Sequence, residues 1–225
     1  MRRLLLLLAL TALLIGCGGE KKESAQNNTV TDTAALRAQD QAVLAEASQQ
    51  LINHFQNDLR ANLMKAMAEG GPVGAISVCR EVAPAIADSN SVYGWSIRRV
   101  SEKYRNPDDR PTVEEKAVLA GFAPEASTPP EYVENWNTTD SVTEYRFYEP
   151  IYTQPLCLKC HGDLQTIAPG VLAAVKKNYP DDRATGYQDG QLRGMFVVEV
   201  LYPEGMAYAR RLIGDTTAQV PQDSM

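Results

Sequence analysis

The chain has 225 residues, with 22 lysines and arginines against 28 aspartates and glutamates, and a formal net charge of −6. An acidic chain without a basic run argues against nucleic-acid binding, because affinity for the phosphate backbone depends on clustered Lys and Arg. The length is that of a single domain, large enough for one hydrophobic core.

The N-terminus has the pattern of an export signal. Two arginines at the start precede an apolar run, 4–15, that is too short to span a bilayer. The run is followed by Gly16-Cys17, which predicts a lipoprotein signal peptide over 1–16, cleavage before Cys17 and acylation of its sulfur. An ordinary secretory signal with an incidental cysteine is the alternative, but the small residue before Cys17 and the polar stretch after it favour lipidation. We therefore expect a lipid anchor on the periplasmic or extracytoplasmic face of a bacterial membrane.

Composition divides the rest of the chain into three parts. Residues 17–33 are poor in apolar side chains and are expected to form a lipidated, flexible tether. Residues 34–214 are expected to form the folded domain. Residues 215–225 are expected to form a disordered tail.

Two helices are predicted at the start of the domain. Apolar residues recur at steps of three and four over 34–68, which is the pattern of a long amphipathic helix. Gly70-Gly71 predicts its end, and a second helix is expected over 72–88, kinked or ended by Pro84. Cys79 shares the apolar face of this second helix and should point inward.

Strands dominate the later part of the domain. Strands are predicted over 92–100, 142–149 and 194–201, helices over 112–122, 168–177 and 204–213, and a mostly irregular loop over 123–135. The helix near 112–122 begins with a capping box of Thr112 and Glu115. Helices first and strands later, without a βαβ alternation, predict an α+β fold with an antiparallel sheet.

The most informative motif is Cys157-Leu158-Lys159-Cys160-His161, which has the C-x-x-C-H form of a covalent c-type haem attachment site. Two thiols at this spacing can add to the two vinyl groups of one haem, and the adjacent histidine then binds the iron. A redox dithiol and half of a zinc site are the alternatives. Zinc is disfavoured because there is no second C-x-x-C and only one other histidine. A thioredoxin-like dithiol is disfavoured because the βαβ setting is missing.

Residue types alone leave the second axial ligand of the iron open. The candidates are Cys79, His54, Met64, Met67, Met195 and Met206, and the position can also have no protein ligand. Each candidate also has an ordinary structural explanation. A methionine usually packs in the core, His54 can lie on the surface, and Cys79 can be a small buried hydrophobic residue. Cys79 is nevertheless the cysteine left over when Cys17 is acylated and the motif cysteines carry haem. A lone thiol in an oxidising compartment is a liability unless it is buried or bound.

Several spaced segments together resemble one family, the monohaem c-type proteins with a PAS-like fold first described from cyanobacteria. Related domains precede bacterial histidine kinases. The similarity runs from about residue 58 to residue 201 and is carried, in order, by 75–79, 83–87, 94–101, 105–107, 145–146, 157–162, 179–182, 186–187 and 193–194. Such a series is far more specific than the C-x-x-C-H motif alone.

The resemblance implies a PAS-like antiparallel sheet flanked by N-terminal helices, with one haem c attached through Cys157 and Cys160. It also implies that the iron is bound by His161 and Cys79. A thiolate ligand favours ferric iron, so we expect a potential well below that of a Met/His cytochrome. The sequence contains no kinase portion, which leaves any signalling output unaccounted for.

Arginines and aromatic residues on the predicted strands are candidates for further haem contacts. Those that can pair with haem propionates, unless they lie on a solvated face, are Arg98, Arg99, Arg105 and Arg146. Arg98 and Arg99 point to opposite sides of a strand, so we expect only one of them to reach the haem. Trp95 and Tyr145 can pack on the porphyrin, although an aromatic residue on a strand more often belongs to the core.

These features predict a lipid-anchored haem protein for extracytoplasmic electron transfer or redox sensing, rather than a catalyst. A diatomic gas sensor that loses Cys79 from the iron on reduction is the alternative. A peroxidase is disfavoured because His54 is the one histidine left for acid–base chemistry. The expected partners are a membrane surface, through Cys17, and an unidentified redox protein that is basic or neutral, and nucleic acid is not expected.

Overall fold

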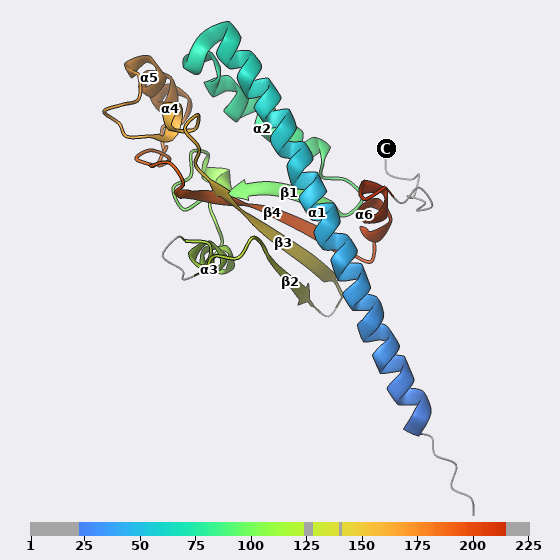
Figure 1. Ribbon diagram of the computed structural model, residues 1–225. Coiled ribbons are helices and arrows are strands. Elements are labelled where there is room, and N and C mark those ends of the chain that lie inside the picture. The colour runs from blue at the N-terminus through green and yellow to red at the C-terminus, as the bar shows by residue number, and fades with distance from the viewer. Residues whose placement is uncertain (1–22, 124–127, 140, 215–225) are drawn as a thin grey trace, which may run out of the picture. The chain divides into compact units, whose positions relative to one another are not determined.

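The computed structural model describes residues 23–123, 128–139 and 141–214 (Figure 1). The predicted signal peptide 1–16, the lipidation site Cys17 and the tail 215–225 lie outside the described residues. Contacts divide the chain into two units, 1–38 and 39–225. The described part of the first unit, 23–38, is helical throughout. The second unit contains the rest of this helix, the sheet and the other helices.

The first helix, α1, runs from Glu23 to Gly74 and is longer than predicted. Residues 23–33, which were expected to belong to a flexible tether, are helical, so that part of the prediction is wrong. The physical reason is that extending an existing helix adds one hydrogen bond per residue, whereas starting a new one is costly. The predicted break at Gly70-Gly71 is confirmed, because Gly71 has φ 62° and ψ −166°, outside the helical region, and Pro72 follows it.

Four antiparallel strands form one sheet with the order β1-β4-β3-β2 (Figure 1). Their bounds are Trp95–Val100 for β1, Val133–Thr138 for β2, Thr143–Tyr152 for β3 and Leu192–Tyr202 for β4. This mixture of helices with an antiparallel sheet confirms the predicted α+β class. The central strand β4 contains the apolar run Met195–Val198, buried on both faces, which explains why it gives a clear strand pattern in the sequence.

Strand β2 was not predicted, and only its first three residues, 133–135, fall in the segment 123–135 that was expected to be mostly loop. Its sequence, Val-Glu-Asn-Trp-Asn-Thr, is rich in residues that disfavour strands. It forms because it pairs along its whole length with β3, from Val133 opposite Tyr148 to Thr138 opposite Thr143. An edge strand is half solvated, and therefore tolerates polar side chains that a central strand would not.

Each face of the sheet has its own core. On one face, α1 packs against the sheet through a cluster formed by Leu44, Ala47, Leu51, Ile52, Phe55, Trp95, Ile97, Tyr145, Phe147, Phe196, Val198 and Val200. On the other face, α3 (Val113–Gly121) and the residue after it pack through Leu119, Phe122, Val100, Tyr148, Met195 and Val197. The predicted alternation along β1 is confirmed, since Trp95 and Ile97 belong to the first cluster and Val100 to the second.

The remaining helices are short. They are the π-helix η1 (Val78–Val82), α2 (Ala83–Ser89), the 3₁₀-helix η2 (Pro107–Asp109), α4 (Leu158–His161), α5 (Pro169–Asn178) and α6 (Met206–Leu212). The predicted capping box of α3 is present, with Thr112 and Glu115 each accepting the other's backbone N–H. Among the helices described, none combines the length and the apolar character needed to cross a membrane.

A third apolar cluster lies beyond the end of the sheet. Ile76, just after α1, packs against α5 and its flanks through Ile167, Val171, Val175 and Tyr179, and Cys160 packs against the same cluster. This cluster fixes the segment that carries Cys79 beside the segment that carries the C-x-x-C-H motif, although the two are far apart in the sequence.

Candidate functional site

A cavity of about 240 Å³ lies where these segments meet the end of the sheet. Its apolar lining includes Leu59, Leu63 and Met67 of α1 with Ile76, Val100, Ile151 and Leu156. Its polar and charged lining includes Cys79, Cys157, Cys160, His161, Arg99, Arg105 and Arg193. The three cysteines in the described part of the chain, all free thiols, therefore share one largely apolar pocket with His161.

The C-x-x-C-H motif forms a single helical turn at the pocket wall. The His161 N–H donates to the Cys157 carbonyl at 2.9 Å, and the Gly162 N–H donates to the Leu158 carbonyl at 3.0 Å. A Cβ on Gly162 would lie 2.5 Å from the Leu158 carbonyl oxygen. Only glycine therefore fits directly after the histidine while this turn is kept. The motif thus opens a short helix, α4, after a loop.

The His161 ring is held in one orientation by the loop that precedes β4. Its Nδ1 lies 2.7 Å from the Ala184 carbonyl oxygen, and because a carbonyl can only accept, Nδ1 carries the hydrogen. Burial lowers the pKa of His161 well below its usual value, and the Arg193 and Arg105 guanidinium groups lower it further. The imidazole is therefore neutral, with Nε2 free to accept a metal, as in histidine ligands whose other nitrogen is tied to a carbonyl.

Arg105 connects the motif to the same loop. Its Nε donates to Asp182 at 3.0 Å, and its Nη2 donates to the Cys160 carbonyl at 2.7 Å. Both members of the ion pair are buried, with side-chain exposures of 5% and 10%. The Ala184 N–H donates to the Asp182 carboxylate at 3.1 Å, so the pair also fixes the residue whose carbonyl orients His161. The predicted propionate-binding role of Arg105 competes with these contacts, since only Nη1 has no partner among the described residues.

Cys79 is placed at the pocket by an irregular turn. It lies on the π-helix η1, which ends at Val82, two residues before Pro84. Proline has no N–H, and its ring would clash with the Arg80 carbonyl in a regular α-helix, so the wider turn relieves the strain. Single π turns occur often at functional sites. The side chain is half-buried and lines the pocket, in agreement with the inward position predicted from the sequence.

The Cys160 thiol is held in its protonated form by its surroundings. Burial raises the pKa of Cys160; Arg105 opposes this, and the thiols of Cys79 and Cys157 add to it. Within the described ranges, no group of three or more His, Cys, Asp or Glu side chains is placed to hold a metal ion.

Arg99 and Arg193 are two of the cations that line the pocket, together with Arg105 and Lys159. Arg99 lies with its guanidinium 5.6 Å from the Phe55 ring centroid, and no carboxylate of the described residues forms an ion pair with it. Arg193 donates from Nη1 to Ser101 Oγ at 2.7 Å. Burial raises the pKa of the nearby Asp109, and Arg99 and Arg193 counteract that rise. Arg193 was not singled out as a haem contact from the sequence, although the Arg193-Gly194 pair was among the segments that carried the resemblance.

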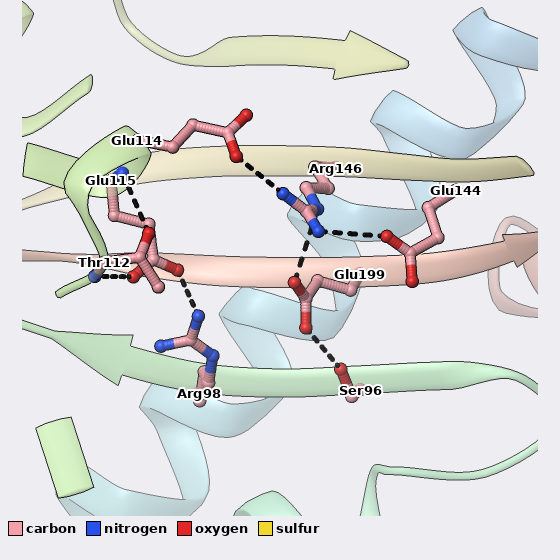
Figure 2. A network of polar contacts seen from close by, with 8 residues as sticks. All are labelled: Ser96, Arg98, Thr112, Glu114, Glu115, Glu144, Arg146 and Glu199. Carbon is pink, nitrogen blue, oxygen red and sulfur yellow. Dashed lines mark hydrogen bonds and ion pairs between the residues drawn. The ribbon is translucent and has the colours of Figure 1, made fainter. Parts of the chain in front are cut away.

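Arg98 and Arg146 do not line this pocket. Figure 2 shows both of them in polar contacts with glutamate side chains. Arg98 pairs with Glu115 of α3 on the opposite face of the sheet. Arg146 pairs there with three carboxylates, those of Glu114 at 2.9 Å, Glu144 at 3.0 Å and Glu199 at 3.4 Å. The expectation that they reach haem propionates is corrected: strand alternation turns them toward α3, and the carboxylates satisfy them.

Trp95 and Tyr145 also lie away from the pocket. Trp95 is buried and donates from Nε1 to the Gly205 carbonyl at 2.9 Å. Tyr145 is fully buried, donates its hydroxyl to the Glu134 carboxylate, and packs edge-on against Trp136 at 5.2 Å between ring centroids. Both serve the core between α1 and the sheet, so their expected packing on a porphyrin is likewise corrected.

The other axial-ligand candidates separate clearly by position. His54 is exposed and pairs with Asp58 on the surface of α1, and Met64 is also exposed. Met195 is buried beneath α3, and Met206 packs with α6 against the first core. Met67 lines the pocket. Cys79 and Met67 are thus the two candidates that the fold brings near His161.

Comparisons with known proteins assign the chain to a family. No curated protein matches. A solved structure described as the cyanobacterial heme-protein Tll0287 is 30% identical in sequence, with a TM-score of 0.45, and the match covers 56% of this chain and 73% of that one. The family model described as Tll0287-like matches residues 22–200, which include every residue of the pocket. The chain belongs to the Tll0287-like family.

Proposed function

We propose that this protein binds one haem covalently in the pocket and transfers single electrons through it, as a c-type cytochrome with a PAS-like fold. The observation that carries the proposal is the convergence of Cys157, Cys160, His161 and the distant Cys79 on one apolar cavity. The description of the related Tll0287 as a heme-protein supports it.

The residues present fit such a group in chemistry and position. Cys157 and Cys160 would hold it through thioether bonds, and His161 would bind iron through Nε2, the nitrogen left free by the Ala184 contact. Cys79 would supply the second axial ligand from the opposite segment. Arg99 and Arg193 are the pocket cations suited to the propionates, since guanidinium groups bind carboxylates in pairs of hydrogen bonds.

Bound haem would supply a one-electron couple, and the protein's contribution is to set its potential. A thiolate from Cys79 stabilises ferric iron and gives a low potential. The apolar lining limits water in the pocket. The positive charge of Arg99 and Arg193 would raise the potential and so oppose the effect of the thiolate. We further propose that the protein is anchored through acylated Cys17 on the extracytoplasmic side of a membrane, where it exchanges electrons with a redox protein or reports redox state.

A gas-sensing function is the second candidate, and one observation favours it. Cys79 lies on a single π turn and is half-buried, so its release on reduction would disturb little of the packed core. Carbon monoxide added to reduced protein separates the two functions: a rapid spectral change favours sensing, and an unchanged spectrum favours electron transfer. A peroxidase would need an acid–base group near the iron, and His54 is exposed on α1.

Covalent attachment can be tested directly. The full chain is exported from a bacterial host that contains the c-type haem attachment machinery, then denatured and stained for haem on a gel. We expect stain at the mass of the protein, its loss in Cys157→Ala/Cys160→Ala, and its retention in the control Cys79→Ala. Release of all haem from the wild-type chain on denaturation would contradict covalent attachment.

A further inference from the structure

Tyr179, at the end of α5, carries a buried polar group that none of the roles above uses. The residue is 7% exposed and packs in the apolar cluster with Ile76, Val171 and Val175. Its hydroxyl has no hydrogen-bond partner among the described residues. A buried hydroxyl without a partner is uncommon in native proteins, so its presence calls for an acceptor close to the hydroxyl.

The position of Tyr179 points to Cys79 as that acceptor. Both residues line the main pocket, and both line a second cavity beside it. Their chain neighbours are bonded to each other, because Arg80 donates from Nη1 to the Asn178 side chain at 2.8 Å. This bond ties η1 to the end of α5, and so holds Cys79 and Tyr179 beside one another.

A tyrosine hydroxyl carries its hydrogen at neutral pH, so Tyr179 can act as a hydrogen-bond donor. A neutral thiol is a weak acceptor, whereas an iron-bound thiolate is a strong one, so the hydrogen bond would become favourable only when Cys79 is bound to iron.

We propose that Tyr179 is a positioning residue that donates a hydrogen bond to the Cys79 sulfur when this sulfur ligates the haem iron. The proposal rests on the proposed function, and specifically on Cys79 as a ligand. A hydrogen bond to the sulfur withdraws electron density from it, weakens its donation to ferric iron and raises the potential. The same bond would hold the sulfur toward the iron rather than toward the second cavity.

The test uses the haem-loaded full chain and Tyr179→Phe, which removes one oxygen. We expect the midpoint potential to fall by about 59 mV, a tenfold change for a one-electron couple. The iron–sulfur stretching frequency should rise in the variant, and in the wild type alone it should shift when the solvent is exchanged for D₂O. Tyr148→Phe is the matched control, because it also removes a buried hydroxyl, but on the α3 face of the sheet.

An unchanged potential and an iron–sulfur stretch insensitive to D₂O would overturn the proposal. A lower potential with an unchanged stretch would also overturn it, because the hydroxyl would then act on another acceptor, such as a propionate. If Tyr179→Phe fails to fold, the D₂O measurement on the wild type decides the outcome. Failure of Cys79 as a ligand is distinguishable, because wild type and Cys79→Ala would then show the same spectra.

Discussion

At the scale of single residues, Arg105 and His161 show how the pocket is organised before any cofactor binds. Arg105 holds the Cys160 carbonyl and Asp182, and the loop from Asp182 to Ala184 holds the His161 ring. The orientation of the imidazole is therefore fixed, through Nδ1, by contacts that do not involve iron. Such outer contacts set the orientation and basicity of a ligand, and their loss usually impairs metal binding.

Removing Arg105 should be strongly destabilising. Arg105→Ala leaves Asp182 as an uncompensated buried charge and frees the Cys160 carbonyl, which should lower the free energy of unfolding by about 3–5 kcal/mol. Urea denaturation of the haem-free chain measures this loss in the free energy of unfolding. The control Arg60→Ala changes an exposed arginine on α1 and should have little effect. A loss below about 1 kcal/mol for Arg105→Ala would contradict the role of the buried pair.

The lowered pKa of His161 predicts a pH dependence. The unfolded chain has the ordinary histidine pKa of about 6.5, while the buried ring has a lower one, so the unfolded state binds more protons below pH 6.5. Stability contributed by the neutral ring is complete above pH 6.5 and is lost as the pH falls. We expect the haem-free chain to lose about 1 kcal/mol between pH 6.5 and 5.5 through this group.

Comparison of two histidine variants isolates this contribution. His161→Gln should flatten the pH dependence in that window, whereas His54→Gln, at an exposed position, should leave it unchanged. Equal slopes for the wild type and His161→Gln would show that the ring does not carry the effect.

At the scale of elements, the two faces of the sheet have different tasks. The face toward α1 is aromatic and aliphatic core and ends at the pocket through Arg99. The face toward α3 is held partly by charge, through Arg98 with Glu115 and Arg146 with Glu114 (Figure 2). The polar network therefore docks α3 and takes no part in the candidate haem site.

The capping box of α3 gives a test of this docking. Thr112→Ala removes one cap and should cost about 1 kcal/mol. Glu115→Ala removes the reciprocal cap and also the partner of Arg98, so it should cost more, about 2–3 kcal/mol. Val113→Ala, at a side chain that is 86% exposed, is the control. Equal losses in thermal or urea denaturation for Thr112→Ala and Glu115→Ala would show that the ion pair contributes nothing.

Local patterns predicted the elements whose stability is local. The capping box, the alternation in β1 and the apolar run in β4 each identify an element, and the glycine pair before Pro72 identifies a break. Strand β2 could not be predicted in this way, because its polar sequence becomes a strand only by pairing with β3. The helical extension of α1 to Glu23 was missed because a polar composition does not prevent a helix from continuing.

The site residues divide in the same way, into those that the sequence made candidates and those whose role depends on tertiary packing. Cysteine counting and the C-x-x-C-H motif made Cys79 and His161 candidates, because the chemistry restricts the residue types, and the structure places both at the pocket. Arg193 and Tyr179 lie in segments that carried the family resemblance, but residue type and periodicity alone did not single them out, because their importance comes from tertiary packing. Arg98 and Arg99 were correctly predicted to diverge, but the alternation alone could not decide which of them faces the pocket.

At the scale of the whole second unit, the pocket joins segments from most of the domain. Its lining comes from α1, η1, β1, β3, α4 and β4, so a covalently held group there would crosslink the helical layer to the C-terminal half. The covalent bonds would persist on unfolding, but contacts of the group with the pocket and with Cys79 would form only in the folded state and would stabilise it. We expect the free energy of unfolding of the haem-loaded chain to exceed that of Cys157→Ala/Cys160→Ala by at least about 3 kcal/mol. This corresponds to roughly 6–12 °C in Tm for a domain of this size. Equal melting temperatures would contradict such a crosslink.

The ferric electron paramagnetic resonance spectrum of haem-loaded wild type, recorded beside Cys79→Ala and Met67→Leu, tests the central claim most directly. Cys79 and Met67 are the two candidate ligands in the pocket, so the pair of variants separates them. We predict a low-spin thiolate signal in the wild type that is retained in Met67→Leu and lost in Cys79→Ala. Identical spectra for the wild type and Cys79→Ala would contradict ligation of the iron by Cys79.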